Sequence, residues 1–106
     1  MYFIKLDELP KKNLLAGTEV RFVNSRNMTI AHWNFNANAR LPEHSHLHEQ
    51  VTNIIQGEFE LTVNGQTKIL EPGSVAVIPP GAVHSGKAVT DCYCIDAFYP
   101  VREDYR

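Results

Sequence analysis

The dipeptide Asn64-Gly65 separates two short runs of strand-forming residues, EFELTV at 58–63 and QTKIL at 66–70. Asparagine and glycine tolerate the positive φ angles that both central residues of a tight hairpin turn require. The two runs are therefore expected to form neighbouring antiparallel strands, since so short a connection cannot join parallel ones.

Other runs rich in β-branched and aromatic residues occur along the chain, and turn-forming residues separate them. The last of them reads CYCIDAFY at 92–99, and a Pro-Pro-Gly corner at 79–81 ends the run before it. A helical turn is expected only near LDELPKKNLL, close to the N-terminus. Short strands separated by turn signals indicate an all-β fold, an antiparallel sandwich or barrel with little helix. The remaining expected strands are 19–24, 28–36, 50–56 and 74–78.

The length of 106 residues fits a single domain, 1–106, with a barrel core at about 19–100. The formal net charge is -2, so no basic field exists to attract a phosphate backbone, and nucleic acid is not an expected partner. No stretch approaches the length of a membrane span, and the N-terminus lacks the unbroken apolar run of a signal peptide. The expected location is therefore the cytoplasm, without a membrane partner.

Three of the five histidines, His44, His46 and His48, stand at alternate positions, and Gln50 continues the series. Side chains alternate on a strand, so His44 and His46 share a face and can converge on one ion. Gln50 can join them only if the chain turns between them, and 47–49 offers such a turn. His48 would then lie in the bend, outside the site. The alternative is a solvated, polar strand end.

A second segment runs from a turn glycine, Gly73, through Pro79-Pro80-Gly81 to His84. Together the two segments resemble the paired motifs of the cupin superfamily. The first motif reads Gly, five residues, His-x-His, three or four residues, Glu, six residues, Gly. The second reads Gly, five residues, Pro-x-Gly, two residues, His, three residues, Asn. The matching positions are His44, His46, Gln50, Gly57, Gly73, Pro79, Gly81 and His84.

The chain departs from these motifs at three places: Asn38 replaces the first glycine, Ala88 the final asparagine, and Gln50 the usual glutamate. With three neutral imidazoles, an amide in place of a carboxylate leaves a divalent site near a charge of about +2, a stronger Lewis acid towards an anion. Imidazole with oxygen ligands suits zinc, nickel, iron, manganese or copper, and the sequence does not choose among them. The resemblance implies a jelly-roll-like β-barrel that holds one divalent metal ion through His44, His46, Gln50 and His84.

The last expected strand places Cys92, Cys94, Asp96 and Phe98 on one face, and Arg102 follows shortly after it. If that face is the interior, Asp96 points towards the site. The alternatives are a surface aspartate paired with the tail arginine, and a core phenylalanine. The ending DAFYPVREDY also resembles the small pectin-degradation cupins that linearise 4,5-unsaturated uronates. In that group an Asp-x-Phe-x-Pro-x-Arg ending accompanies a His-x-His, Gln and His metal site.

This resemblance implies a metal-dependent conversion of 4,5-unsaturated monouronates, the products of pectin or alginate lyases, to linear 5-keto-4-deoxyuronates by ring opening and ketonisation. The substrate would be a small anionic sugar. Asp96 would carry the proton, Arg102 would hold the substrate carboxylate and assist catalysis, and Phe98 would pack on the sugar face. Two alternatives stay open: another metal-dependent cupin enzyme, such as a dioxygenase, and a non-catalytic sugar- or ligand-binding cupin.

The other aromatic and sulfur-containing residues are expected to be structural. Trp33 and Phe35 alternate on a strand and are expected in the core. The two cysteines are expected to be buried and free, because residues two apart on a strand would form a strained disulfide. Small cupins commonly pair, and the apolar outer face of the last strand agrees with a homodimer.

Overall fold

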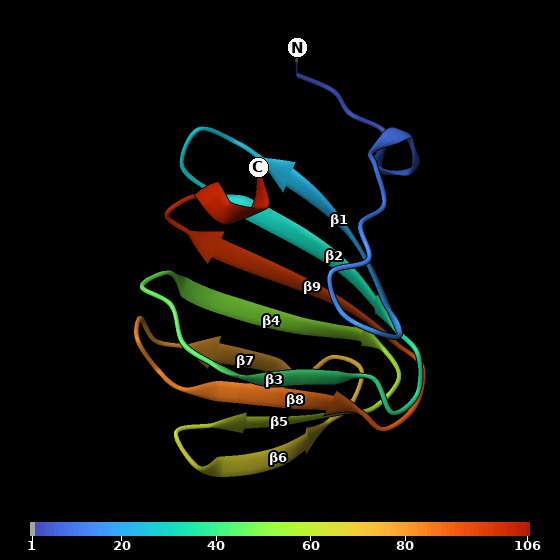
Figure 1. Cartoon of the computed structure of the whole chain (residues 1–106), viewed down its shortest axis with the longest axis vertical. Coiled ribbons are helices and arrows are strands. Elements are labelled where there is room, and N and C mark those ends of the chain that lie inside the picture. Colours follow the sequence, from blue (N-terminus) through green and yellow to red (C-terminus); the bar gives the residue numbers. More distant parts are fainter. Residues whose placement is uncertain (1) are drawn as a thin grey trace.

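The computed structural model describes residues 2–106 and consists of two packed antiparallel β-sheets (Figure 1). One sheet has the strand order β1-β2-β9-β4-β7 and the other β3-β8-β5-β6, which confirms the expected all-β architecture. Helix is limited to two short 3-10 turns, η1 (Leu6–Glu8) and η2 (Glu103–Tyr105), within the described residues. The strands are β1 (Thr18–Asn24), β2 (Thr29–Phe35), β3 (Arg40–His44), β4 (Glu49–Gln56), β5 (Phe59–Val63), β6 (Gln66–Leu70), β7 (Val75–Ile78), β8 (His84–Ala88) and β9 (Cys92–Tyr99).

The hairpin expected at Asn64-Gly65 is confirmed. Asn64 has a φ angle of 48° and Gly65 one of 80°, and β5 pairs with β6 across this turn. Each strand expected from the sequence begins and ends within one residue of its predicted bounds. No bounds were predicted for β3 and β8, although His44 and His46 were expected to share a strand face. The two strands carry His44 and His84.

The core lies between the two sheets and follows the alternation of the strands. Trp33 and Phe35 on β2 are buried and stack on each other, and Phe35 contacts Phe59 of the opposite sheet. Cys92 and Cys94 on β9 are buried and free. The predictions for these aromatic and cysteine residues are therefore confirmed.

The inner face of the five-stranded sheet changes from apolar to polar along β4 and β9. Ile54 lies opposite Cys94, and two residues further along each strand Thr52 lies opposite Asp96. All four side chains are buried. A buried polar group needs a partner or a function, so the polar end of this face is the place to look for a site.

Two positions in the loops require a left-handed backbone. Asn38, which replaces the first motif glycine, has a φ angle of 71° and so keeps the conformation that glycine would supply. Gly57 has a φ angle of 83°, and a Cβ atom there would overlap the carbonyl oxygen of Asp91 and crowd Thr90 and Cys92. Gly57 is therefore required both for its backbone conformation and for close packing.

Replacing Gly57 by alanine is expected to destabilise the protein more than replacing Gly73, whose φ angle of 90° is similar but whose Cβ would meet open space. The left-handed conformation costs roughly 1–2 kcal/mol in both variants. The collision at Gly57 adds about 1–3 kcal/mol. Urea unfolding of Gly57→Ala and Gly73→Ala measures the difference, and equal losses would contradict the crowding seen at Gly57.

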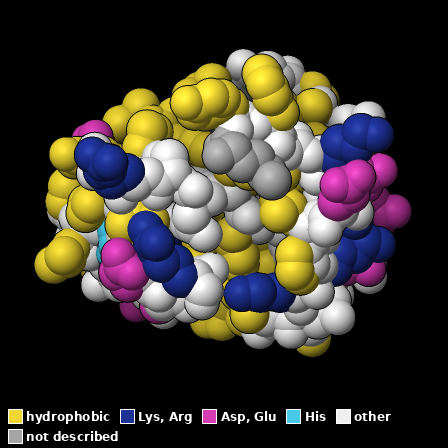
Figure 2. Space-filling model, turned by 90° about the horizontal axis from the view of Figure 1, so that it is seen from above, with side chains coloured by type: hydrophobic (Ala, Val, Ile, Leu, Met, Phe, Trp, Pro, Cys, Tyr) yellow, Lys and Arg dark blue, Asp and Glu magenta, His cyan; other side chains and the backbone are white. Residues whose placement is uncertain are grey.

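The surface carries charges of both signs. On the face that Figure 2 shows, Lys and Arg side chains lie interspersed with Asp and Glu, and exposed hydrophobic side chains lie between them. Over residues 2–106, no helix has the length and apolar character needed to cross a membrane.

Candidate active site

Three histidines converge at the polar end of the barrel interior. His44 is the last residue of β3 and lies opposite His84, the first residue of β8. His46 reaches the same place from the loop after β3, and not from the strand itself as expected. One ring nitrogen from each lies within 4.8 Å of the others. This spacing is compatible with three imidazoles that share one ion.

The backbone orients all three rings in the same way. Each ring faces a carbonyl oxygen through Nδ1, at 2.8 Å for His44 and 2.9 Å for both His46 and His84. When Nδ1 donates its hydrogen, the lone pair of the neutral ring lies on Nε2, the atom that faces the cluster. The carbonyls belong to Pro42, His48 and Ala82, respectively.

Two polar atoms at the centre of the cluster fit a cation. The Nε2 atom of His84 is buried and has no hydrogen-bond partner among the described residues. The Nε2 atom of His46 lies 3.1 Å from Oε1 of Gln50, whose amide nitrogen already donates to Thr52. Two lone pairs then face each other, and a metal ion bound by both atoms satisfies them. The side chains present therefore fit the divalent metal that the sequence motifs imply.

The electrostatic surroundings favour the neutral form of two of these histidines, His46 and His84. Burial lowers the pKa of His46 to about 4, and the positive charge of Arg102 adds to the effect. Burial also lowers the pKa of His84. Imidazole binds a metal only in its neutral form, so both rings are ready to act as ligands at neutral pH.

His48 lies outside this group. The chain bends at 47–48 before β4 begins at Glu49, as expected. Among the described residues, the set of side chains close enough to share an ion contains His44, His46 and His84, and not His48. The turn also brings Gln50 beside His46, and its role as the fourth ligand stays a prediction.

Asp96 points into the barrel and not to the surface. It is 8% exposed and lines a small internal cavity of ≈ 20 Å³ together with Gln50 and His84. Burial raises the pKa of Asp96 to about 6, although hydrogen bonding to Thr52 and Gln50 opposes the shift. A carboxyl group with this pKa exchanges a proton readily near neutral pH.

Arg102 and Phe98 form one wall of the site. The Arg102 guanidinium lies 4.8 Å from the centre of the Phe98 ring, and that ring packs edge-on against His46. The Nε and Nη2 atoms of Arg102 donate to the two carboxylate oxygens of Asp104, at 3.0 and 2.7 Å. The tail arginine therefore pairs with Asp104 and not with Asp96. This bond lowers the pKa of the Asp104 carboxyl group.

An apolar hollow of ≈ 280 Å³ opens beside His44, and its lining includes Trp33, Leu41 and Tyr105. This is near the lower end of the roughly 300–1,000 Å³ of pockets for drug-sized ligands.

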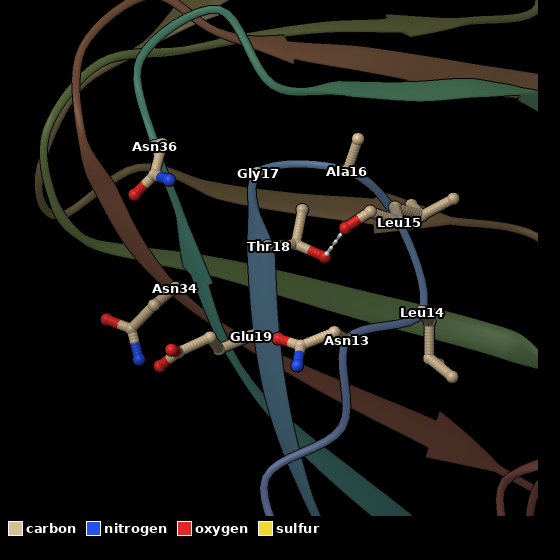
Figure 3. Close-up of a pocket in the computed structure, with 9 residues that line it drawn as sticks. All are labelled: Asn13, Leu14, Leu15, Ala16, Gly17, Thr18, Glu19, Asn34 and Asn36. Carbon is tan, nitrogen blue, oxygen red and sulfur yellow. Dashed lines mark hydrogen bonds between the residues drawn. The ribbon is translucent and has the colours of Figure 1, made fainter.

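A second hollow, of ≈ 480 Å³, lies at the start of β1 and holds no histidine (Figure 3). Its side chains include Asn13, Glu19 and Asn34, and Thr18 donates to the Leu15 carbonyl at 2.7 Å. Because Asn13, Glu19 and Asn34 are exposed, this hollow is a feature of the surface and separate from the histidine cluster.

Sequence reasoning did not single out Thr52, Asp104 or Tyr105. Thr52 could have been found because it follows Gln50 by two positions on the same strand face. Asp104 and Tyr105 gave no such signal, because both contact Arg102 only through the final 3-10 turn, η2. Tyr105 lies 4.1 Å from the Arg102 guanidinium and stacks on Phe22.

The packed antiparallel sheets and the histidine cluster define the class of protein. Residues 31–98 match the model of the cupin domain, and the chain belongs to this family. The pectin degradation protein KdgF of Dickeya dadantii (strain 3937) is 27% identical over 107 residues, which cover 98% of this chain and 96% of that protein. The resemblance to pectin-degradation cupins seen in the motifs is thus confirmed.

Two solved structures are similar over the whole chain. The RmlC-like cupin from Shewanella frigidimarina NCIMB 400 superposes with a TM-score of 0.94 at 26% identity, covering 100% of this chain and 96% of the other. KdgF from Halomonas sp. gives a TM-score of 0.92 at 27% identity, with 100% and 99% covered. Neither comparison requires a large insertion, so the fold described above extends over the full length of both relatives.

Proposed function

We propose that this protein converts 4,5-unsaturated monouronates to linear 5-keto-4-deoxyuronates in a metal-dependent reaction. The observation that carries the proposal is the convergence of ring nitrogens from three histidines beside a buried carboxyl group, Asp96, within one barrel. The full-length similarity to two KdgF proteins, one of them named for pectin degradation, supports this choice of substrate class.

The reaction is an isomerisation that needs one proton moved. The C1 hydroxyl of the cyclic sugar loses its proton, the bond between C1 and the ring oxygen breaks, and C4 gains a proton as the C5 ketone forms. Asp96 is suited to take the first proton and deliver the second, because its raised pKa of about 6 makes both of its forms accessible near neutral pH.

The substrate carboxylate needs a fixed position during this transfer. Arg102 is nearly buried, and its planar guanidinium can hold a carboxylate by parallel hydrogen bonds. Its pairing with Asp104 shows that the side chain already binds a carboxylate in this place. A divalent ion held by His44, His46, His84 and Gln50 would supply Lewis-acid stabilisation for negative charge on a nearby oxygen.

The decisive experiment mixes the metal-loaded protein with a lyase-generated unsaturated monouronate and follows the ultraviolet absorbance of its conjugated double bond. A loss of absorbance that depends on both protein and metal supports the proposal. No loss with zinc, nickel, iron, manganese or copper would refute it. Oxygen uptake by the iron-loaded protein would then indicate a dioxygenase, and uronate binding without turnover a sensor.

Arg102→Lys is expected to raise KM about 10–100-fold, because lysine keeps the charge but loses the paired hydrogen bonds, each worth about 1.5–3 kcal/mol. The matched control is Arg106→Lys on the same tail, which pairs with Glu103 at the surface. Steady-state kinetics on the unsaturated uronate measures both variants. An unchanged KM in Arg102→Lys would remove Arg102 from carboxylate binding.

We also propose that the outer face of the five-stranded sheet packs against a second copy of the chain. A continuous apolar row crosses this face from Ile30 through Ala97 and Val51 to Val77, which is 69% exposed. Val77→Lys is therefore expected to shift the protein to monomer in sedimentation velocity, whereas Ile69→Lys on the opposite sheet is not. A monomeric wild type would overturn this proposal.

A further inference from the structure

Thr52 lies between two parts of the site, the predicted metal ligand Gln50 and the carboxyl group of Asp96. It follows Gln50 by two positions on β4, and it lies directly opposite Asp96 on β9. All three side chains are buried, with exposed fractions of 4% for Gln50, 5% for Thr52 and 8% for Asp96. Polar groups buried this deeply must satisfy one another.

The donors and acceptors of these three groups are arranged in one direction. The amide nitrogen of Gln50 donates to Oγ1 of Thr52 at 2.9 Å. A hydroxyl that accepts one bond still has its own hydrogen to donate. The Asp96 carboxyl group lies opposite Thr52 in the register of the two strands, and it accepts hydrogen bonds when ionised. These groups can therefore form a hydrogen-bonded series from the Gln50 amide through the Thr52 hydroxyl to the Asp96 carboxylate.

The two outer members of this series, Gln50 and Asp96, face the candidate active site. At one end, the amide oxygen of Gln50 is turned to Nε2 of His46. At the other end, Oδ1 of Asp96 is buried and has no hydrogen-bond partner within residues 2–106. If Thr52 binds the amide nitrogen of Gln50 and one oxygen of Asp96, the amide oxygen and the other carboxyl oxygen remain available to the site.

The same geometry accounts for a glutamine at a position where cupins usually carry glutamate. A carboxylate at position 50 has no hydrogen to donate to Thr52. It would also place a second negative charge beside the buried Asp96, and like charges at close range destabilise each other. An amide supplies a ligand oxygen and a donor together, so it can serve the histidine cluster and Thr52 at once.

We propose that Thr52 is a positioning residue whose hydroxyl links the Gln50 amide to the Asp96 carboxyl group. It holds the amide oxygen towards the three histidines and the carboxyl group towards the substrate. The part concerning Asp96 rests on the proposed uronate reaction. The part concerning Gln50 requires only that the site binds a metal.

The test compares Thr52→Val, which removes the hydroxyl, with Thr52→Ser, which keeps it and loses the methyl group. Residues that hold a metal ligand in place typically contribute 10–100-fold to metal affinity or activity. Thr52→Val is therefore expected to weaken cobalt or zinc binding by about 10–100-fold and to lower kcat at least about 10-fold with little change in KM. Thr52→Ser should stay within about 3-fold of the wild type in both measurements.

A role in packing alone gives a different result, because the melting temperature would then fall in both variants while metal affinity and kcat stayed unchanged. That outcome would overturn the proposal, as would a serine variant impaired as much as the valine variant. Gln50→Glu provides a second test if Thr52→Val does not fold: it should keep the metal and lose kcat at least about 10-fold. If the wild type turns over no unsaturated uronate, the uronate reaction fails, and the metal affinities still decide whether Thr52 positions Gln50.

Discussion

Replacing His84 by alanine is expected to reduce affinity for a divalent metal by at least about 100-fold, since neighbouring groups that merely orient a ligand already contribute 10–100-fold. His84 is 1% exposed, and its Nε2 atom points into the cluster without another partner in the described chain. Among the His, Cys, Asp and Glu side chains of the described residues, only His44 and His46 lie close enough to share an ion with it, and both are already ligands in the proposed site. Titration calorimetry with zinc or cobalt measures the loss.

His48→Ala is the matched control for this variant. His48 belongs to the same histidine-rich segment, but it lies outside the cluster, and its contribution to His46 is a backbone carbonyl that alanine retains. Metal affinity in this variant should remain within about 3-fold of the wild type, the usual scale for changes away from a ligand. Strong loss in His48→Ala with little loss in His84→Ala would mean that the metal binds elsewhere.

Asp96→Asn is expected to lower kcat by about 10²–10⁴-fold with little change in KM, because asparagine keeps the shape and loses the exchangeable proton. The variant should bind metal normally, since Asp96 is not among the histidine ligands. Kinetics on the unsaturated uronate, with metal content measured on the same sample, gives both quantities. Turnover close to that of the wild type would exclude Asp96 as the proton carrier.

The same variant should become more stable relative to the wild type as the pH rises. In the folded protein the pKa of Asp96 is raised from 3.8 to about 6, so the native state holds this proton more tightly than the unfolded state. Between these two values the wild type loses stability with increasing pH, and the loss is complete above the folded pKa. The free energy of unfolding of metal-free Asp96→Asn, relative to that of the wild type, should increase by about 1–3 kcal/mol between pH 4.5 and pH 7.5. Urea unfolding at the two pH values measures this difference.

Local patterns were sufficient to predict most of the fold. The Asn64-Gly65 turn and the β-branched runs depend on neighbours in the sequence, and the structure confirmed their bounds. The two strands without a prediction contain poor strand formers. Pro42 is tolerated because β3 is a sheet edge, and Gly86 on β8 is covered by the ring of Phe59. Both compensations come from the tertiary structure.

The site divides in the same way. Motif spacing pointed to the histidines, and alternation along β9 put Asp96 on the same face as Cys92 and Cys94, because both follow from the local geometry of a strand. Only the structure shows that this face is the interior. Thr52 acquires its role from the register between β4 and β9, which sets it opposite Asp96. Asp104 acquires its role from the turn that brings it onto Arg102. Neither relation can be inferred from one run of residues.

The way in which the backbone holds the three histidine rings affects how freely this part of the sequence can evolve. The acceptors for His44, His46 and His84 are main-chain carbonyls only two residues away from each ring. Every amino acid carries such a carbonyl, so mutation of a neighbouring side chain leaves the acceptor in place. Lineages of this protein can therefore exchange the residues around the ligands, and change what the pocket accepts, without losing the orientation of the imidazoles.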